Sequence, residues 1–134
     1  MPQRAVDPII ASSLNIVDDL AHLPEDQWFE RKSGRIQPKK LAEAVVGLAN
    51  AEGGTIAVGI HDGEADPPSA DRINDFRQVA HDFTTPTVRM LAEEHEIDGG
   101  GRLLILRVSP GDRVHETASG DCFLRVGDET KKLS

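Results

Sequence analysis

Apolar positions near the start of the chain recur with the spacing expected on one face of a helix. The pattern ends just before Pro24, a residue that ends helices. It therefore predicts a first helix that ends near His22. The four apolar positions, separated by four, three and four residues, are Ile10, Leu14, Val17 and Ala21.

A strand, a helix and a second strand are expected next. Two aromatic residues flanked by charges predict a strand over 27–32. Pro38 suits a first helical turn, and apolar positions at 41, 45 and 48 line a helix that stops near Gly53 and Gly54. Residues 55–60 are mostly apolar or β-branched, which is typical of a central strand buried on both faces. A unit of about 35 residues with this order fits a crossover connection within one sheet.

The second half of the chain changes from a helical to a strand period. Ser69 is a suitable cap for a third helix, which ends before Pro86. The segments 88–97 and 102–108 flank three glycines and predict a hairpin, and 121–126 predicts a further strand. The expected fold is α+β, with a mixed β-sheet of about five to six strands and about three packed helices.

Composition places the chain among globular proteins. It has 134 residues, 38% of them hydrophobic, which favours one domain with an aliphatic core. The single Cys122 cannot form an internal disulfide, so we expect a cytoplasmic location. The longest apolar stretch, 42–51, is short and interrupted by polar residues, so we expect no membrane partner.

The net charge of -8 disfavours nucleic-acid binding through overall charge, so any such binding needs a local basic patch. Two basic sets are candidates for nucleic-acid contact, although both also fit an ordinary solvated surface. The first lies within residues 31–40, a stretch without an acidic residue, and comprises Arg31, Lys32, Arg35, Lys39 and Lys40. The second comprises Arg125, Lys131 and Lys132.

Three carboxylates are candidates for metal chemistry. Glu25 and Glu30 flank the first strand, and Asp62 follows the next one. Converging carboxylates can hold Mg²⁺ or Mn²⁺ and activate water for attack on a phosphodiester. Five residues of extended chain span about 16 Å, so Glu25 and Glu30 share a site only if the chain bends after Pro24. The spacing alone therefore leaves open a metal site or surface acids beside a strand.

Three segments together resemble the Schlafen-type AlbA-like domain family. They are Glu25-x-x-x-x-Glu30-Arg31-Lys32, the run Leu48 to Ile60 with its Ala-Asn-Ala-Glu-Gly-Gly core, and Phe123-Leu124-Arg125-Val126-Gly127-Asp128. The resemblance divides the chain into an N-terminal helical extension, 1–24, and an AlbA-like domain, 25–134. It implies that the domain is one part of a longer protein.

The same resemblance implies two different functions. Bacterial members are described as DNA-binding modules of transcriptional regulators, whereas some Schlafen members are metal-dependent RNases. In the nuclease case the matching metal-binding and catalytic carboxylates are Glu25, Glu30 and Asp62, with Lys32 at a phosphate and Mg or Mn as cofactor.

Three functional hypotheses follow. The first is a nucleic-acid-binding module, for DNA or RNA, within a transcriptional regulator. The second is the Mg- or Mn-dependent nuclease. The third is a protein-interaction module or homodimer, which the acidic net charge favours.

Overall fold

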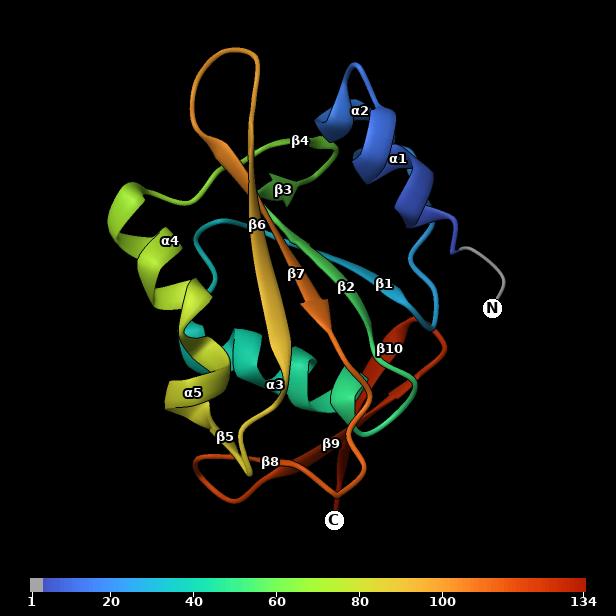
Figure 1. Cartoon of the computed structure of the whole chain (residues 1–134), viewed down its shortest axis with the longest axis vertical. Coiled ribbons are helices and arrows are strands. Elements are labelled where there is room, and N and C mark those ends of the chain that lie inside the picture. Colours follow the sequence, from blue (N-terminus) through green and yellow to red (C-terminus); the bar gives the residue numbers. More distant parts are fainter. Residues whose placement is uncertain (1–3) are drawn as a thin grey trace.

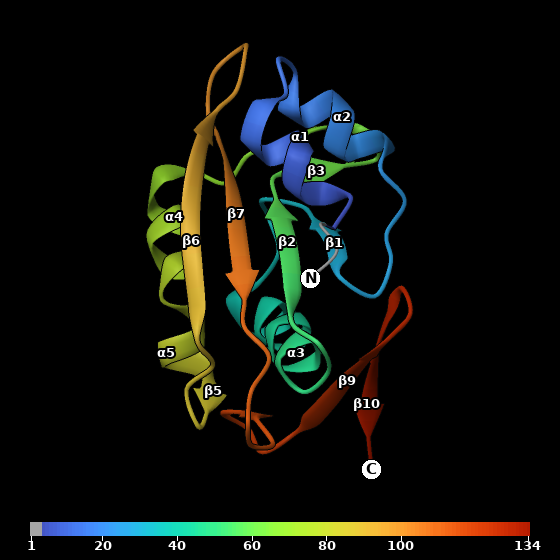
Figure 2. The same ribbon diagram turned by 45° about the vertical axis from the view of Figure 1, so that its right-hand side comes forward.

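Four strands form the central sheet of the structure, a computed structural model that describes residues 4–134. They are β1 (Phe29–Lys32), β2 (Gly54–Val58), β6 (Met90–Glu96) and β7 (Arg102–Val108), in the order β1-β2-β7-β6. β1 and β2 are parallel, whereas β7 is antiparallel to β2 and β6 (Figure 2). The predicted mixed α+β fold is confirmed, and its main sheet has four strands.

The remaining strands of the described chain form three two-stranded sheets. Their pairs are β3 (Ile60–His61) with β4 (Glu64–Ala65), β5 (Thr84–Thr85) with β8 (Glu116–Thr117), and β9 (Cys122–Val126) with β10 (Glu129–Leu133). The strand expected over 55–60 is divided between β2 and β3 at Gly59, whose φ of 128° breaks the extended run. The strand expected over 121–126 is β9, and its partner β10 was not predicted.

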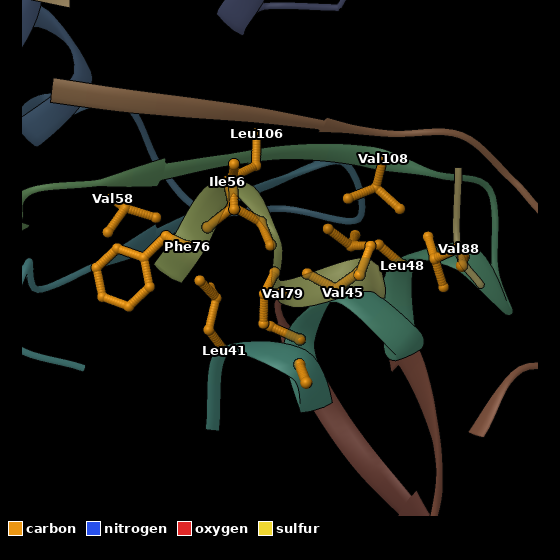
Figure 3. Close-up of a cluster of buried hydrophobic side chains, with 14 of the residues drawn as sticks. Leu41, Val45, Leu48, Ile56, Val58, Phe76, Val79, Val88, Leu106 and Val108 are labelled. Atoms are coloured by element: carbon orange, nitrogen blue, oxygen red, sulfur yellow. The ribbon is translucent and has the colours of Figure 1, made fainter. Parts of the chain in front are cut away.

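Three helices cover one face of the sheet and form the main core. They are α3 (Pro38–Ala49), which connects β1 to β2, α4 (Ala70–Arg77) and α5 (Val79–Phe83). Figure 3 shows side chains of α3, α4 and α5 packed against β2 and β7. The labelled members of this cluster are Leu41, Val45, Leu48, Ile56, Val58, Phe76, Val79, Val88, Leu106 and Val108.

The third predicted helix is present but interrupted. The Ser69 Oγ accepts a hydrogen bond from the backbone N–H of Arg72, as expected of a cap. The helical run then breaks at Gln78, whose φ of -100° and ψ of 4° separate α4 from α5. No helix in residues 4–134 is long and apolar enough to cross a membrane.

Two short helices, α1 (Val6–Ser12) and α2 (Ile16–His22), cover part of the opposite face (Figure 1). The prediction of one helix through Ile10 and Ala21 is therefore wrong. Ser13 is extended, and the Asn15 side chain caps α2 by accepting from the backbone N–H of Asp18. This local cap starts a new helix and leaves Leu14 fully exposed, although its spacing had placed it on the buried face.

The turn from α3 into β2 needs a glycine at position 53. Gly53 has a φ of 75°, and its N–H donates to the carbonyl of Leu48 at the end of α3. A Cβ at this position would lie 2.6 Å from the carbonyl oxygen of Val108. The glycine therefore lets the chain reverse closely against β7 and enter the sheet.

Candidate nucleic-acid interface

The three predicted metal ligands lie in different environments. Glu30 is in β1 with its side chain only 8% exposed, and its Oε1 lies 2.9 Å from Lys32 Nζ. The Glu25 Oε2 accepts a hydrogen bond of 2.7 Å from the backbone N–H of Arg31. The Asp62 side chain is 87% exposed and lies beside His61. Glu25 and Glu30 thus have partners within the protein, whereas the Asp62 side chain faces solvent.

These carboxylates do not fit a metal centre. Within the described residues, no group of three or more His, Cys, Asp and Glu side chains could hold a metal ion. The second oxygen of Glu30, Oε2, lies 3.0 Å from Arg125 Nη1, so both oxygens of this carboxylate face protein cations. The geometry gives no support to the expected Mg or Mn site at Glu25, Glu30 and Asp62.

Arg125 is buried, which corrects its predicted role as a phosphate contact. Its side chain is 0% exposed, and its Nη2 donates to the carbonyls of Asp26 and Phe29, each at 2.9 Å. Its Nη1 makes the ion pair with Glu30, although that oxygen accepts no aligned hydrogen bond from a described residue. Arg125 therefore joins β9 to β1 and cannot reach a ligand at the surface.

Arg31 is a second predicted contact that has a structural role. Its Nη1 donates to the backbone carbonyls of Leu20, at 2.9 Å, and Leu23. Its guanidinium also lies 5.5 Å from the centre of the Phe29 ring, within range of a cation–π interaction. Arg31 thus holds the end of α2 against β1.

The other members of the first predicted basic set lie around the loop between β1 and α3, where Lys32 is half-buried and the rest, Arg35, Lys39 and Lys40, are exposed. Arg35 is positioned by Asp66, because both Ser33 Oγ and Arg35 Nε donate to the same carboxylate oxygen. The N–H of Gly34 also donates to the carbonyl of Asp66, at 2.8 Å. The Ser33 hydrogen bond is the main cause of a lowered pKa at Asp66, and Arg35 lowers it further. This loop is therefore fixed to the segment that follows β4.

The first turn of α3 extends this basic surface. Lys39 and Lys40 are both exposed; Lys40 lies 3.2 Å from Glu43, and Lys39 has no ion-pair partner in residues 4–134. The N-cap, Gln37, makes no side-chain cap bond, and the first turn of α3 has no acidic residue. Each of the other four described helices has an acidic residue there. Lysines at the positive end of a helix dipole are unfavourable unless an anion is near.

The second basic set lies at the opposite end of α3. Lys131 and Lys132 are exposed on β10, 3.5 Å from Glu129 and 3.4 Å from Asp121 respectively. Thr130 approaches Gly47, in the C-terminal half of α3. A helix of this length spans about 18 Å, so the structure does not merge the two sets into one patch. We call Lys32, Arg35, Lys39 and Lys40 the α3 basic surface.

Comparisons with known proteins agree with this architecture. The crossover β1-α3-β2, the hairpin β6-β7 and the closing hairpin β9-β10 all lie within residues 25–134. The chain belongs to the Schlafen, AlbA_2 family, whose model matches residues 25–134. The resemblance inferred from the sequence motifs is confirmed. No curated protein matches the chain.

Two solved structures share the fold. The DIP2311 protein from Corynebacterium diphtheriae aligns with a TM-score of 0.65 and 23% identity over 95% of this chain. The chain spans only 26% of that protein. The N-terminal domain of a protein from Nitrosomonas europaea, described as related to the ATP-dependent DNA helicase RecG, aligns with a TM-score of 0.56 and 20% identity. That alignment covers 82% of this chain and 76% of the domain.

Proposed function

We propose that this chain is a nucleic-acid-binding module that contacts the phosphate backbone through the α3 basic surface. The observation that carries the proposal is the group of cations around the start of α3, of which Arg35, Lys39 and Lys40 are exposed, in a chain whose net charge is -8. A phosphate near Lys39 and Lys40 would relieve their repulsion from the helix dipole. Phosphate contacts of this kind position a protein on nucleic acid without selecting a sequence.

The comparisons support the same class of function. The chain belongs to the Schlafen, AlbA_2 family, and one structural neighbour belongs to a protein named for its relation to a DNA helicase. Because the chain spans 26% of the other neighbour, we propose that it works inside a larger regulatory protein. Lys131 and Lys132 form a second, separate contact point for a longer ligand.

The experiment measures fluorescence anisotropy of labelled single-stranded DNA, duplex DNA and structured RNA at several salt concentrations. The test variant is Lys39→Gln with Lys40→Gln, and the control is Arg89→Gln with Arg113→Gln. Both pairs remove two exposed cations, and neither Arg89 nor Arg113 has an ion-pair partner among the described residues. We expect the lysine variant to reduce the slope of log K against log salt by about 2.

The control should bind like the parent chain. Equal loss in both variants would show that only net charge matters and would overturn the α3 basic surface as the contact. Absence of binding to all three ligands at low salt would overturn the proposed function. The ranking of the three ligands identifies which nucleic acid the module prefers.

A further inference from the structure

The two edges of the main sheet differ in how their backbone groups are satisfied. At the β1 edge, the carbonyl of Phe29 accepts from Arg125 Nη2 and from the N–H of Asp26. The next outward N–H, that of Arg31, donates to Glu25. Side chains and a local turn therefore satisfy these two outward groups of β1, which is a common protection against unwanted strand pairing.

At the other edge, β6 keeps its outward backbone groups open. The carbonyl of Arg89 accepts from the N–H of Ser109, and the N–H of Ile97 donates to Gly101. Because pairing directions alternate along an antiparallel strand, odd-numbered residues of β6 bond β7 and even-numbered residues point outward. Among the described residues, none forms a hydrogen bond with these outward N–H and C=O groups. We call these four residues the open edge: Met90, Ala92, Glu94 and Glu96.

The surface beside the open edge is accessible. Figure 1 shows β6 in front of the other strands, with no helix crossing before it. Leu91 is 68% exposed, on the sheet face opposite the α3 core. Arg89 is exposed and has no ion-pair partner in residues 4–134. An exposed leucine next to unpaired backbone is a typical docking position for another strand.

We propose that the open edge pairs with the same edge of a second copy of this chain, in antiparallel register about a two-fold axis at Leu91. In this register Leu91 lies opposite Leu91 of the second copy, and Arg89 lies opposite Glu93 of the second copy. Met90 and Ala92 of the two copies exchange their outward backbone hydrogen bonds. The two-fold axis repeats each contact, so the interface is self-complementary.

Charge favours this register over one centred on Glu93. Centring the axis on Glu93 would place two carboxylates directly opposite each other, which is destabilising. Centring it on Leu91 instead places a cation without an ion pair opposite each Glu93. Glu93 already accepts from Arg107 at 2.6 Å, so Arg89 would extend an existing ion-pair network. The apolar contact between the two leucines then lies between two such pairs.

The interface is small, so the dimer should form at high protein concentration. Sedimentation equilibrium from micromolar to near-millimolar concentration measures it directly. At the concentration where half of the parent chain is dimeric, Leu91→Glu should be monomeric. Val114→Glu is the matched control, because Val114 is 69% exposed, lies outside the main sheet and receives the same change. This control should dimerise like the parent chain.

A cross-linking experiment tests the register. Leu91→Cys in a Cys122→Ser background places one cysteine of each copy opposite the other. Their Cα atoms are then about 4.5 Å apart, a separation that a disulfide can span. Under mild oxidation we expect much faster covalent dimer formation than with Val114→Cys in the same background. Non-reducing electrophoresis measures both rates.

Three outcomes would overturn the proposal. A parent chain that stays monomeric throughout would leave the open edge to a strand of a different protein. A dimer that survives Leu91→Glu would use another surface. Equal cross-linking rates for the two cysteine variants would exclude the Leu91 register.

Discussion

Arg125 joins segments that are far apart in the sequence, since its guanidinium contacts both Glu30 and the backbone of the chain around β1. Burying two charges costs desolvation energy, which their attraction and the carbonyl hydrogen bonds offset. Removing Arg125 leaves the Oε2 atom of Glu30 buried without its cation, while Oε1 keeps Lys32. The pair is therefore a point of high sensitivity in the fold.

Arg125→Met should lower the free energy of unfolding by about 3–5 kcal/mol, because the Glu30 carboxylate loses its buried cation. Adding Glu30→Gln to this variant should recover part of the loss. Urea denaturation measures both, with Arg113→Met as an exposed control. A loss for Arg125→Met no larger than that of the control would contradict the structural role assigned to Arg125.

The Asp66 carboxylate predicts a stability change in acid. Its hydrogen bonds from Ser33 and Arg35 lower its pKa in the folded state, so it stabilises the fold above its unfolded pKa. This contribution is lost as pH falls through the lowered folded pKa. In thermal melts from neutral to acidic pH, Asp66→Asn should be less stable than the parent at neutral pH and converge with it in strong acid. Asp128→Asn, at an exposed position, should run parallel to the parent throughout.

At the scale of elements, the break between α1 and α2 shows where periodicity misleads. Leu14 fits the apolar spacing of one long helix, but Asn15 offers a side-chain cap to a new helix one residue later. The cap is a local interaction, so it decides where the helix begins, whereas spacing alone cannot distinguish a continuous helix from two short ones. The buried face of this region is supplied by Val17 and Leu20.

This difference has a direct test by truncation. Leu20→Ala should lower the free energy of unfolding by about 2–5 kcal/mol, because Leu20 is fully buried. Leu14→Ala should change it by less than about 0.5 kcal/mol, since the side chain is solvated. Chemical denaturation of the two variants measures this contrast. Similar losses in both would favour a single continuous helix.

Elements with strong local signals could be predicted from the sequence. Pro38 and the apolar spacing define α3, and three glycines between two strand-like runs define the hairpin β6-β7. The strand β10 lacks such a pattern because its residues 129–133 are mostly polar and exposed. Its available signal was the Gly127-Asp128 turn, which suits a tight hairpin.

The residues of the candidate nucleic-acid interface also divide into those with a local sequence signal and those whose environment depends on the tertiary fold. Lys39 and Lys40 could be identified because exposed cations at a helix start depend on local sequence. The sequence could not distinguish Arg125, a buried structural residue, from these exposed cations. Its burial depends on Glu30 and on the carbonyls near β1, which only the tertiary fold brings close to it. The partners of the candidate carboxylates Glu25 and Glu30 could not be predicted for the same reason, since the fold brings them together.

At the scale of the whole molecule, an acidic protein with a local basic surface should bind nucleic acid weakly and in a strongly salt-dependent way. If all four cations of the α3 basic surface contact phosphates, raising salt fourfold should weaken binding about 100-fold. Repulsion between the acidic remainder of the surface and the ligand is strongest at low ionic strength and is screened as salt rises, so it weakens binding and partly offsets this salt dependence. Anisotropy titrations at two salt concentrations measure it, and binding that is insensitive to salt would contradict phosphate contact.

The closed β1 edge has a further consequence for how copies of this chain assemble. A sheet with two open edges could add one molecule after another and polymerise into a fibre. Here the open edge of the main sheet is at β6, and the proposed pairing with a second copy would use the outward groups of Met90 and Ala92 in both molecules. By satisfying backbone groups at the β1 edge, Arg125 and Glu25 would limit the proposed assembly to one continuous sheet of two chains and would disfavour growth into an aggregate.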